Sequence, residues 1–179
     1  MNTRDCNYEF VKKRVKNMSI RVRADGSVIV TVPYSMRTKQ ALAFIESKRE
    51  WIEKKQRQMA ERTVLHVDAL SWNERKADVL REIVKEQYEH FAAYGIPFPL
   101  LRFRKMRSRY GSCNTALAVI TLNKVLADMP RECAEYVAVH ELAHLVEPNH
   151  GRAFYQVLDT VMPEHRIREK RLREYALHN

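Results

Sequence analysis

The segment Pro130–Val146 constrains the fold most, because apolar side chains recur on almost every side of the helix that it predicts. Such a helix has no polar face to turn toward water and is expected at the centre of a core. Residues 140–144 of this segment nevertheless read His-Glu-Leu-Ala-His. A buried imidazole without a hydrogen-bond partner costs about 1 to 3 kcal/mol, so these polar groups need either such partners or a metal.

The spacing of these residues favours the metal. Side chains four apart lie on one helix face, so His140 and His144 can converge on one ion, while Glu141 can reach a water in its open position. His150 adds a third imidazole, and Pro148 favours the turn that would bring it back. Three protein ligands with one position left to water are typical of a catalytic zinc. We therefore expect one Zn²⁺ per chain, held by the three histidines, with Glu141 as the general base.

Strand and helix signals precede this segment near the amino terminus. Residues 19–23 alternate in polarity, residues 28–32 are rich in β-branched side chains, and Asp25–Gly26 between them favours a tight turn. Residues 38–62 then show helical spacing, with Trp51 among the apolar positions. We expect a β-hairpin followed by an amphipathic helix that packs on it.

A second helix is predicted to begin at Ser71, which has the spacing of a capping box with Glu74, and to end at Gly95. Two strand signals follow, Leu100–Met106 and Leu117–Leu122, and we expect them to pair as antiparallel neighbours across a polar turn. In the helix predicted between Ser71 and Gly95, the apolar stripe is formed by Ala77, Leu80, Val84 and Phe91.

These signals together predict an α+β fold, which ends in a short helical segment and a basic helix after Pro163. With 179 residues the chain is near the size of one domain, and we expect one compact unit. Within it, residues 1–62 would form an N-terminal β-hairpin and helix subdomain. Residues 63–179 would form the catalytic domain, with a small antiparallel sheet and the buried HExxH helix.

Two motifs carry a resemblance to a known family. The segment YVAVHELAHLVEPNHGRAF and the upstream Ser-Arg-Tyr-Gly-Ser-Cys at 108–113 resemble the YgjP-like metallopeptidases, whose SRWGSC motif differs only at Tyr110. The resemblance covers nearly the whole chain. It implies a zincin-like, gluzincin-like catalytic domain with His140, His144 and His150 as ligands and Glu141 as base, related more distantly to SprT-like and WLM proteases. Glu147 stands where the metzincin pattern HExxHxxGxxH requires glycine, which argues against that class.

The predicted activity is zinc-dependent peptide hydrolysis, although hydrolysis of a non-peptide amide would use the same residues. An extended protein or peptide substrate needs a free strand edge, and Val119–Asn123, just before the zinc helix, is the candidate. Developing negative charge on the carbonyl oxygen also needs a donor. No spacing rule selects among the four candidate donors, Arg109, Tyr136, Asn149 and Tyr155.

The charge of the chain suggests a second hypothesis. Lys and Arg number 32 against 22 Asp and Glu, a formal net charge of +10, with basic clusters at Lys12–Lys16, Arg102–Arg109 and Arg166–Arg173. If these clusters shared one face they could follow a phosphate backbone. The alternative is therefore a nucleic-acid-associated zinc protein, either a protease acting on nucleic-acid-bound proteins or a binding module.

Cysteine use and hydropathy bear on the compartment. Cys6, Cys113 and Cys133 are widely and unequally spaced, which fits neither a disulfide framework nor a paired-cysteine zinc site, so we expect reduced thiols. No apolar stretch approaches the roughly 18 to 20 residues that span a bilayer, and the first residues lack an apolar signal-type segment. We expect no membrane association and a cytoplasmic location.

Overall fold

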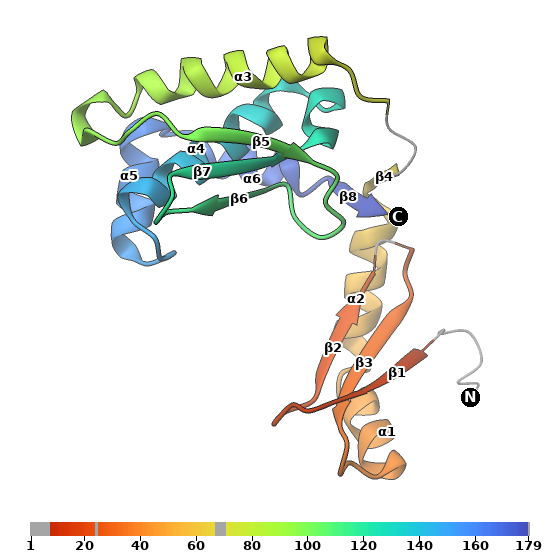
Figure 1. Ribbon diagram of the computed structural model, residues 1–179. Helices are drawn as coiled ribbons and strands as arrows, with labels where there is room; N and C mark the ends of the chain where they lie inside the picture. The colour runs from red at the N-terminus through yellow and green to blue at the C-terminus, as the bar shows by residue number, and fades with distance from the viewer. Residues whose placement is uncertain (1–7, 24, 67–70, 179) are drawn as a thin grey trace. The chain divides into compact units, whose positions relative to one another are not determined.

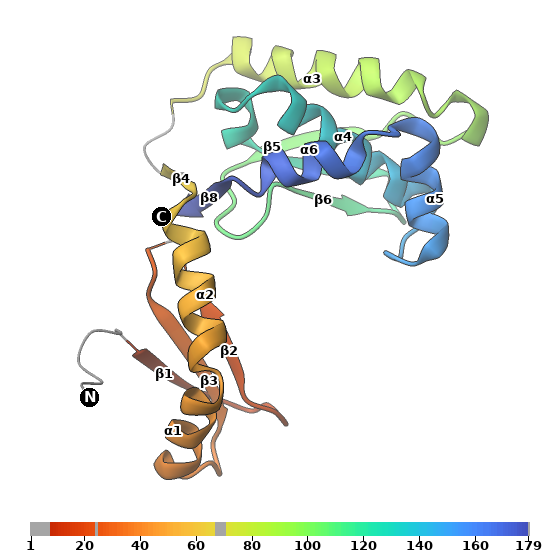
Figure 2. The same ribbon diagram turned by 180° about the vertical axis from the view of Figure 1, so that it is seen from behind.

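The computed structural model describes residues 8–23, 25–66 and 71–178 (Figures 1 and 2). The chain divides into two compact units, Met1–Val64 and Leu65–Asn179. Cys6 lies outside the described residues, and Cys113 and Cys133 are free thiols. Among the described residues, no helix combines the length and the apolar character that a membrane crossing requires.

The N-terminal unit is a three-stranded sheet covered by two helices. The strand order is β1 (Tyr8–Lys13), β3 (Val28–Pro33), β2 (Ser19–Val22), with β2 antiparallel and β1 parallel to β3. The region expected to be one helix is α1 (Thr38–Ser47) and α2 (Arg49–Ala60), separated at Lys48. Alternate strand residues pack against the helices because successive side chains of a strand point to opposite faces. The core consists of Val22, Val28, Val30, Val32, Ala41, Ile45 and Ile52.

The C-terminal unit contains a second three-stranded sheet, in the order β5 (Leu100–Arg104), β7 (Val119–Asn123), β6 (Gly111–Asn114). β7 runs parallel to β5 and antiparallel to β6. The predicted antiparallel pairing of residues 100–106 with 117–122 is therefore wrong, and the sheet is mixed. The antiparallel partner of β7 is β6, which lies in the segment expected to be a polar turn. Its Gly-Ser-Cys-Asn sequence has little intrinsic strand preference, so pairing with β7 rather than local propensity forms it.

The sheet order also corrects the substrate strand. Val119–Asn123 is not an edge strand, because β7 hydrogen-bonds to β5 on one side and to β6 on the other. A central strand has no free backbone groups with which to pair an added peptide. Within the described residues, β6 pairs only with β7, so it is an edge strand of this sheet.

Four helices complete the C-terminal unit: α3 (Glu74–Glu89), α4 (Arg131–Val146), α5 (Arg152–Val161) and α6 (His165–Leu172). Short 3-10 turns are η2 (Ala92–Tyr94) and η3 (Lys124–Asp128), and β8 (Tyr175–His178) pairs with β4 (Thr63–His66).

The start of α3 differs from the prediction. Asn73 is its N-cap, and the Asn73 side chain accepts a hydrogen bond from the backbone N–H of Lys76 at 3.0 Å. Ser71 lies before the helix, so the capping box expected with Glu74 does not form. Asparagine caps a helix as well as serine does. Because the cap is Asn73 rather than Ser71, the helix begins two residues later than predicted.

The core of the C-terminal unit lies on one face of the sheet. Ile120 and Leu122 of β7 point into it and are at most 1% exposed, together with much of α4. Figures 1 and 2 show α4, α5 and α6 on this side of the sheet. The opposite face is open, and side chains of β5 such as Leu100 are exposed there. The buried residues of α4 are Cys133, Ala134, Tyr136, Val137, Ala138, Val139, Glu141, Leu142 and Ala143.

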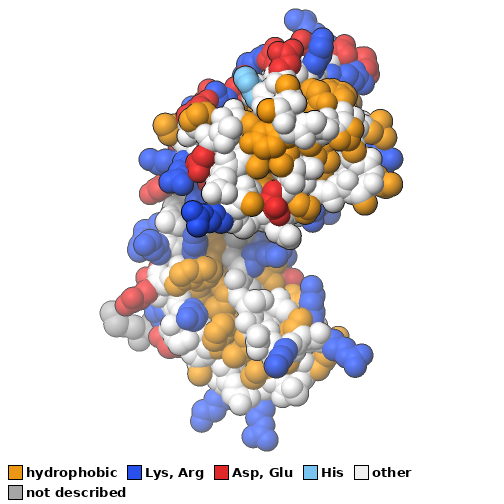
Figure 3. Space-filling model, turned by 90° about the vertical axis from the view of Figure 1, so that its left-hand side faces the viewer, with side chains coloured by type: hydrophobic (Ala, Val, Ile, Leu, Met, Phe, Trp, Pro, Cys, Tyr) orange, Lys and Arg blue, Asp and Glu red, His pale blue; other side chains and the backbone are white. Residues whose placement is uncertain are grey.

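Apolar side chains also gather on the surface of this unit. Figure 3 shows them on the side where β5 and β7 begin. Large hydrophobic residues in and next to these strands are strongly exposed, at 50% for Phe98, 58% for Leu100 and 71% for Leu117.

Candidate metal centre

The carboxyl-terminal half of α4 and the loop that follows bring three histidines together. His140 and His144 lie one turn apart on α4, and His150 comes from the loop before α5. One potential ligand atom of each ring lies within 4.8 Å of those of the other two. The Nε2 atoms of His140 and His150 are 3.0 Å apart. The three histidines selected by their spacing thus face one point.

This cluster has the donor chemistry of a metal site. Nitrogen ligands on one tetrahedral zinc lie about 3.4 Å apart, close to the separation of the two Nε2 atoms here. Burial and, to a smaller extent, the neighbouring imidazoles of His144 and His150 lower the pKa of His140 to about 4, so the ring stays neutral. His144 Nδ1 lies 3.3 Å from the carbonyl oxygen of Glu147, which leaves its Nε2 available. Three imidazoles whose ring nitrogens lie this close together fit a divalent metal such as zinc.

Phe154 of α5 contacts the imidazole rings of all three histidines. Its side chain is fully buried, and its ring centroid lies 5.0 Å from that of His140, 4.6 Å from His144 and 4.7 Å from His150. The sequence predicts a short helical segment around Phe154 but indicates no role for this residue. An aromatic residue four positions after His150, at the start of a helix, is the signal that could have found it.

Glu141 lies on the same helix and faces β6. Its side chain is 6% exposed, and burial raises its pKa to about 7, while the positive charge of Arg109 acts in the opposite direction. A Cβ placed on Gly111 would stand 2.5 Å from Oε1 of Glu141 and 2.8 Å from its Cγ. Only glycine therefore lets the edge strand approach this carboxyl group so closely.

A buried asparagine fixes the loop that leads into β6. Asn123 at the end of β7 is fully buried, and its Nδ2 donates to the carbonyl oxygens of Met106 at 2.6 Å and Arg109 at 2.9 Å. The backbone N–H of Asn123 also donates to the carbonyl oxygen of Tyr110 at 2.8 Å. Sequence reasoning missed this residue, whose hydrogen bonds to Met106, Arg109 and Tyr110 fix the loop that leads to Gly111. A polar residue that ends an apolar strand was its signal.

The four candidate donors for the carbonyl oxygen occupy different places. Tyr136 is buried one turn before His140, with ring centroids 5.9 Å apart, and burial raises its pKa so that the hydroxyl stays protonated. Arg109 is near enough to Glu141 to influence its pKa. Asn149 and Tyr155 are exposed residues on either side of the start of α5.

Comparison with known proteins identifies the class and then the family. Residues 16–72 and 67–175 match the family model described as YgjP-like, metallopeptidase domain. The protein is thus a metallopeptidase, a metal-dependent hydrolase. More particularly, the chain belongs to the YgjP-like family, to which its two motifs already showed a resemblance.

Two crystal structures of metallopeptidase zymogens are similar to part of the chain. Abylysin of Pyrococcus abyssi is 23% identical with a TM-score of 0.47, over 52% of this chain and 90% of that one. Jannalysin of Methanocaldococcus jannaschii is 21% identical with a TM-score of 0.45, over 52% and 92%. No curated protein matches the chain.

Proposed function

We propose that this protein is a zinc-dependent peptidase in which His140, His144 and His150 bind one Zn²⁺ and Glu141 is the general base. The observation that carries the proposal is that potential ligand atoms of three histidines, two from α4 and one from the loop that follows, lie within 4.8 Å of one another. The same helix also presents a buried carboxyl group. Residues 63–179 would form the catalytic domain, in which the HExxH helix packs against a small sheet as in zincins. Family membership supports the reaction class, and the donor set supports zinc.

The chemistry divides between the ion and the chain. Bound zinc supplies a Lewis acid that polarises a peptide carbonyl and lowers the pKa of a water ligand to about 7. Glu141 accepts a proton from the attacking water on a carboxylate oxygen and then delivers it to the leaving amine nitrogen. Its burial between α4 and β6 fixes the carboxyl group and keeps bulk water from competing for the proton. The protonated Tyr136 hydroxyl and the Arg109 guanidinium are the candidate donors to the carbonyl oxygen.

The substrate would lie along β6 rather than β7. An extended peptide that pairs with the free edge of Gly111–Asn114 passes next to Glu141, because Gly111 contacts that carboxyl group. The scissile bond would then lie near Gly111. This assignment replaces the central strand with the edge strand nearest the general base.

Metal content and peptide cleavage test this function together. We expect about one zinc per chain in the wild type by elemental analysis after mild dialysis, and lost or much weaker binding in His140→Ala and His150→Ala. Glu141→Gln should retain the metal but lose about 10²- to 10⁴-fold in cleavage rate. Wild-type protein that takes up no supplied zinc would overturn the proposal. Matched peptide and simple amide substrates distinguish proteolysis from hydrolysis of other amides.

A second candidate is nucleic-acid association, and the distribution of charge favours the N-terminal unit for it. Residues 1–64 carry 15 Lys and Arg against 7 Asp and Glu, a net charge of +8, whereas residues 65–179 carry 17 against 15. The basic cluster Arg166–Arg173 is largely neutralised, since Arg168, Arg171 and Arg173 form ion pairs with glutamates.

Salt dependence tests this candidate. Contacts with several phosphates must weaken steeply as salt rises, so affinity for mixed-sequence DNA and RNA is measured at several salt concentrations. Replacing Lys12, Lys13 and Arg14 with neutral residues should reduce the slope of log affinity against log salt concentration. Absence of binding at low salt would eliminate the candidate without affecting the peptidase proposal.

A further inference from the structure

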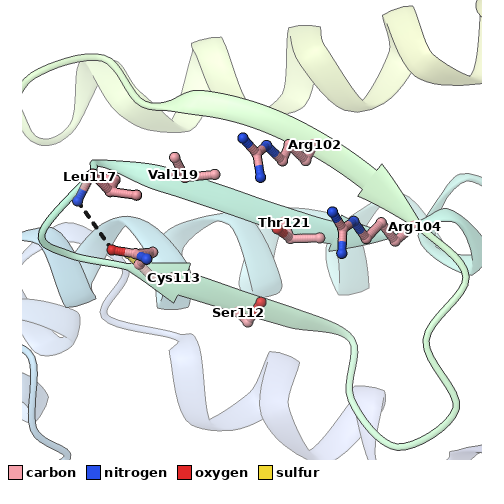
Figure 4. A pocket seen from close by; sticks show the side chains of 8 residues that line it. Arg102, Arg104, Ser112, Cys113, Leu117, Val119 and Thr121 are labelled. Carbon is pink, nitrogen blue, oxygen red and sulfur yellow. Dashed lines mark hydrogen bonds between the residues drawn. The ribbon is translucent and has the colours of Figure 1, made fainter.

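The open face of the C-terminal sheet carries a hollow of about 190 Å³ next to the edge strand β6 (Figure 4). It extends across all three strands, from β5 over β7 to β6. Residues that line it include Arg102, Arg104, Ser112, Asn114, Leu117 and Thr121. The side-chain oxygen of Asn114 accepts a hydrogen bond from the backbone N–H of Leu117 at 3.1 Å, drawn as a dashed line in Figure 4.

Two guanidinium groups give this hollow its charge. Arg102 and Arg104 are two residues apart on β5, share one sheet face, and extend toward β7 in Figure 4. Neither forms an ion pair with any residue that the structure describes, in contrast to the paired arginines of α6. The hydroxyl groups of Ser112 and Thr121 add polar donors to the lining. Paired guanidiniums with nearby hydroxyls favour a carboxylate, which arginine can bind through two parallel hydrogen bonds.

The hollow and Glu141 lie on opposite faces of the same edge strand, β6. Ser112 and Asn114 point to the open face of β6, whereas Gly111 lies against the Glu141 carboxyl group on the other face. A peptide added at this edge also alternates its side chains between the two faces. Every second side chain would therefore stand beside the hollow, while the backbone passes Glu141.

The distances suit a long acidic side chain. A strand added beyond β6 is separated from β5 by three strand spacings of about 4.8 Å, or about 14 Å in all. An arginine that reaches inward from β5 and a glutamate that reaches over β6 can close that gap. Aspartate is one methylene shorter and would reach less well.

We propose that Arg102 and Arg104 form a specificity site that binds a glutamate side chain of the substrate, about one to three residues from the cleaved bond. The assignment rests on the proposed peptidase function and on pairing of the substrate with β6. It gives the enzyme a preference for acidic polypeptides. The exposed side chain of Leu117 also lines the hollow and would contact a neighbouring outward side chain of the substrate.

The test compares zinc-loaded full-length proteins on peptides that differ only by Glu, Asp or Gln at each position. We expect wild-type kcat/KM to be about 10-fold higher with Glu than with Gln at one position, with Asp between them. Arg102→Ala/Arg104→Ala should remove that preference, so that the Glu and Gln peptides are cleaved with similar kcat/KM. Arg102→Glu/Arg104→Glu should favour Lys instead. The matched control is Arg166→Ala/Lys170→Ala, which removes the same charge from α6 and should keep the preference.

A binding measurement separates this proposal from the peptidase function. Fluorescence anisotropy with metal-free protein compares the labelled Glu and Gln peptides. Tighter binding of the Glu peptide by wild type, lost in the Arg102/Arg104 variant, supports the site even if no peptide is cleaved. Equal binding of both peptides, or a preference that survives in that variant, overturns it. Because both arginines are exposed, circular dichroism should show an unchanged fold.

Discussion

Gly111 on β6 lies so close to Glu141 on α4 that a Cβ at Gly111 would stand 2.5 Å from the Oε1 atom of the carboxyl group. This contact joins the edge strand to the general base that we propose. It also explains why glycine occurs in a strand, where its conformational freedom is a cost. The missing side chain provides the space that the carboxyl group occupies.

Gly111→Ala should therefore impair catalysis without removing the metal. The added methyl group must displace Glu141, since the atoms it meets belong to a buried side chain with little room to move. We expect a fall in kcat of about 100-fold, as for other displaced general bases, with zinc content unchanged by elemental analysis. Gly151→Ala is the control, because a Cβ there meets nothing within 4 Å. Equal activity of both variants would contradict the proposed role of the contact.

Phe154→Leu should weaken zinc binding by about 10-fold, because the phenyl ring contacts all three imidazoles and holds their orientation. Competition with a chromophoric chelator measures the affinity. Phe91→Leu is a matched control in the same core, since Phe91 is 1% exposed and has no ring contact with the histidines. Both variants should lose about 1 to 2 kcal/mol of folding free energy. If both also lose zinc affinity equally, Phe154 acts only through stability.

Much of the candidate site could be predicted because its signals are local. The helical period alone places His140 and His144 on one face. In the structure, one ring nitrogen of each of these residues and one of His150 all lie within 4.8 Å of one another. The supporting residues could not be found in this way. Phe154 and Asn123 act through contacts between different elements that form only in the folded chain, so the helical period selects neither residue.

The sheet was predicted less well for a related reason. The Gly-Ser-Cys-Asn of β6 has the composition of a turn and becomes a strand only by pairing with β7. Once β6 is overlooked, the strands before and after it, β5 and β7, look like a hairpin. In the structure the chain passes through β6 first, and β7 then inserts between β6 and β5, parallel to the latter. Pairing order of this kind depends on the tertiary fold, which residue patterns within one strand do not encode.

Alkaline pH should destabilise the protein through Cys133. Burial raises the pKa of this thiol to about 11, and the charge of Glu132 acts in the same direction, so the folded state disfavours the thiolate. An unfolded thiol ionises near pH 8.5. The unfolded state therefore loses its proton first, and the free energy of unfolding should fall as pH rises from about 8.5 to 11. Urea titrations across this range measure the slope.

Cys133→Ala is the control for the alkaline slope. It removes one thiol from a fully buried position and should reduce the dependence on pH, although the cavity lowers stability at every pH. Burial also raises the pKa of Cys113 to about 11, so that thiol should account for a remaining slope. An unchanged slope in this variant would assign the alkaline loss to other groups.

Asn123→Asp should disorganise the loop before β6 while leaving the histidines in place. Aspartate keeps an oxygen for the backbone N–H of Val125 but replaces the amide that donates to the carbonyl oxygens of Met106 and Arg109. The two partly buried carbonyl oxygens would then face a carboxylate oxygen instead of a donor, at a cost of about 1 to 3 kcal/mol in unfolding free energy. We expect lower thermal stability and a fall in kcat through displacement of Gly111, with zinc affinity near the wild-type value. A variant as active as the wild type would show that β6 keeps its place beside Glu141 without these hydrogen bonds.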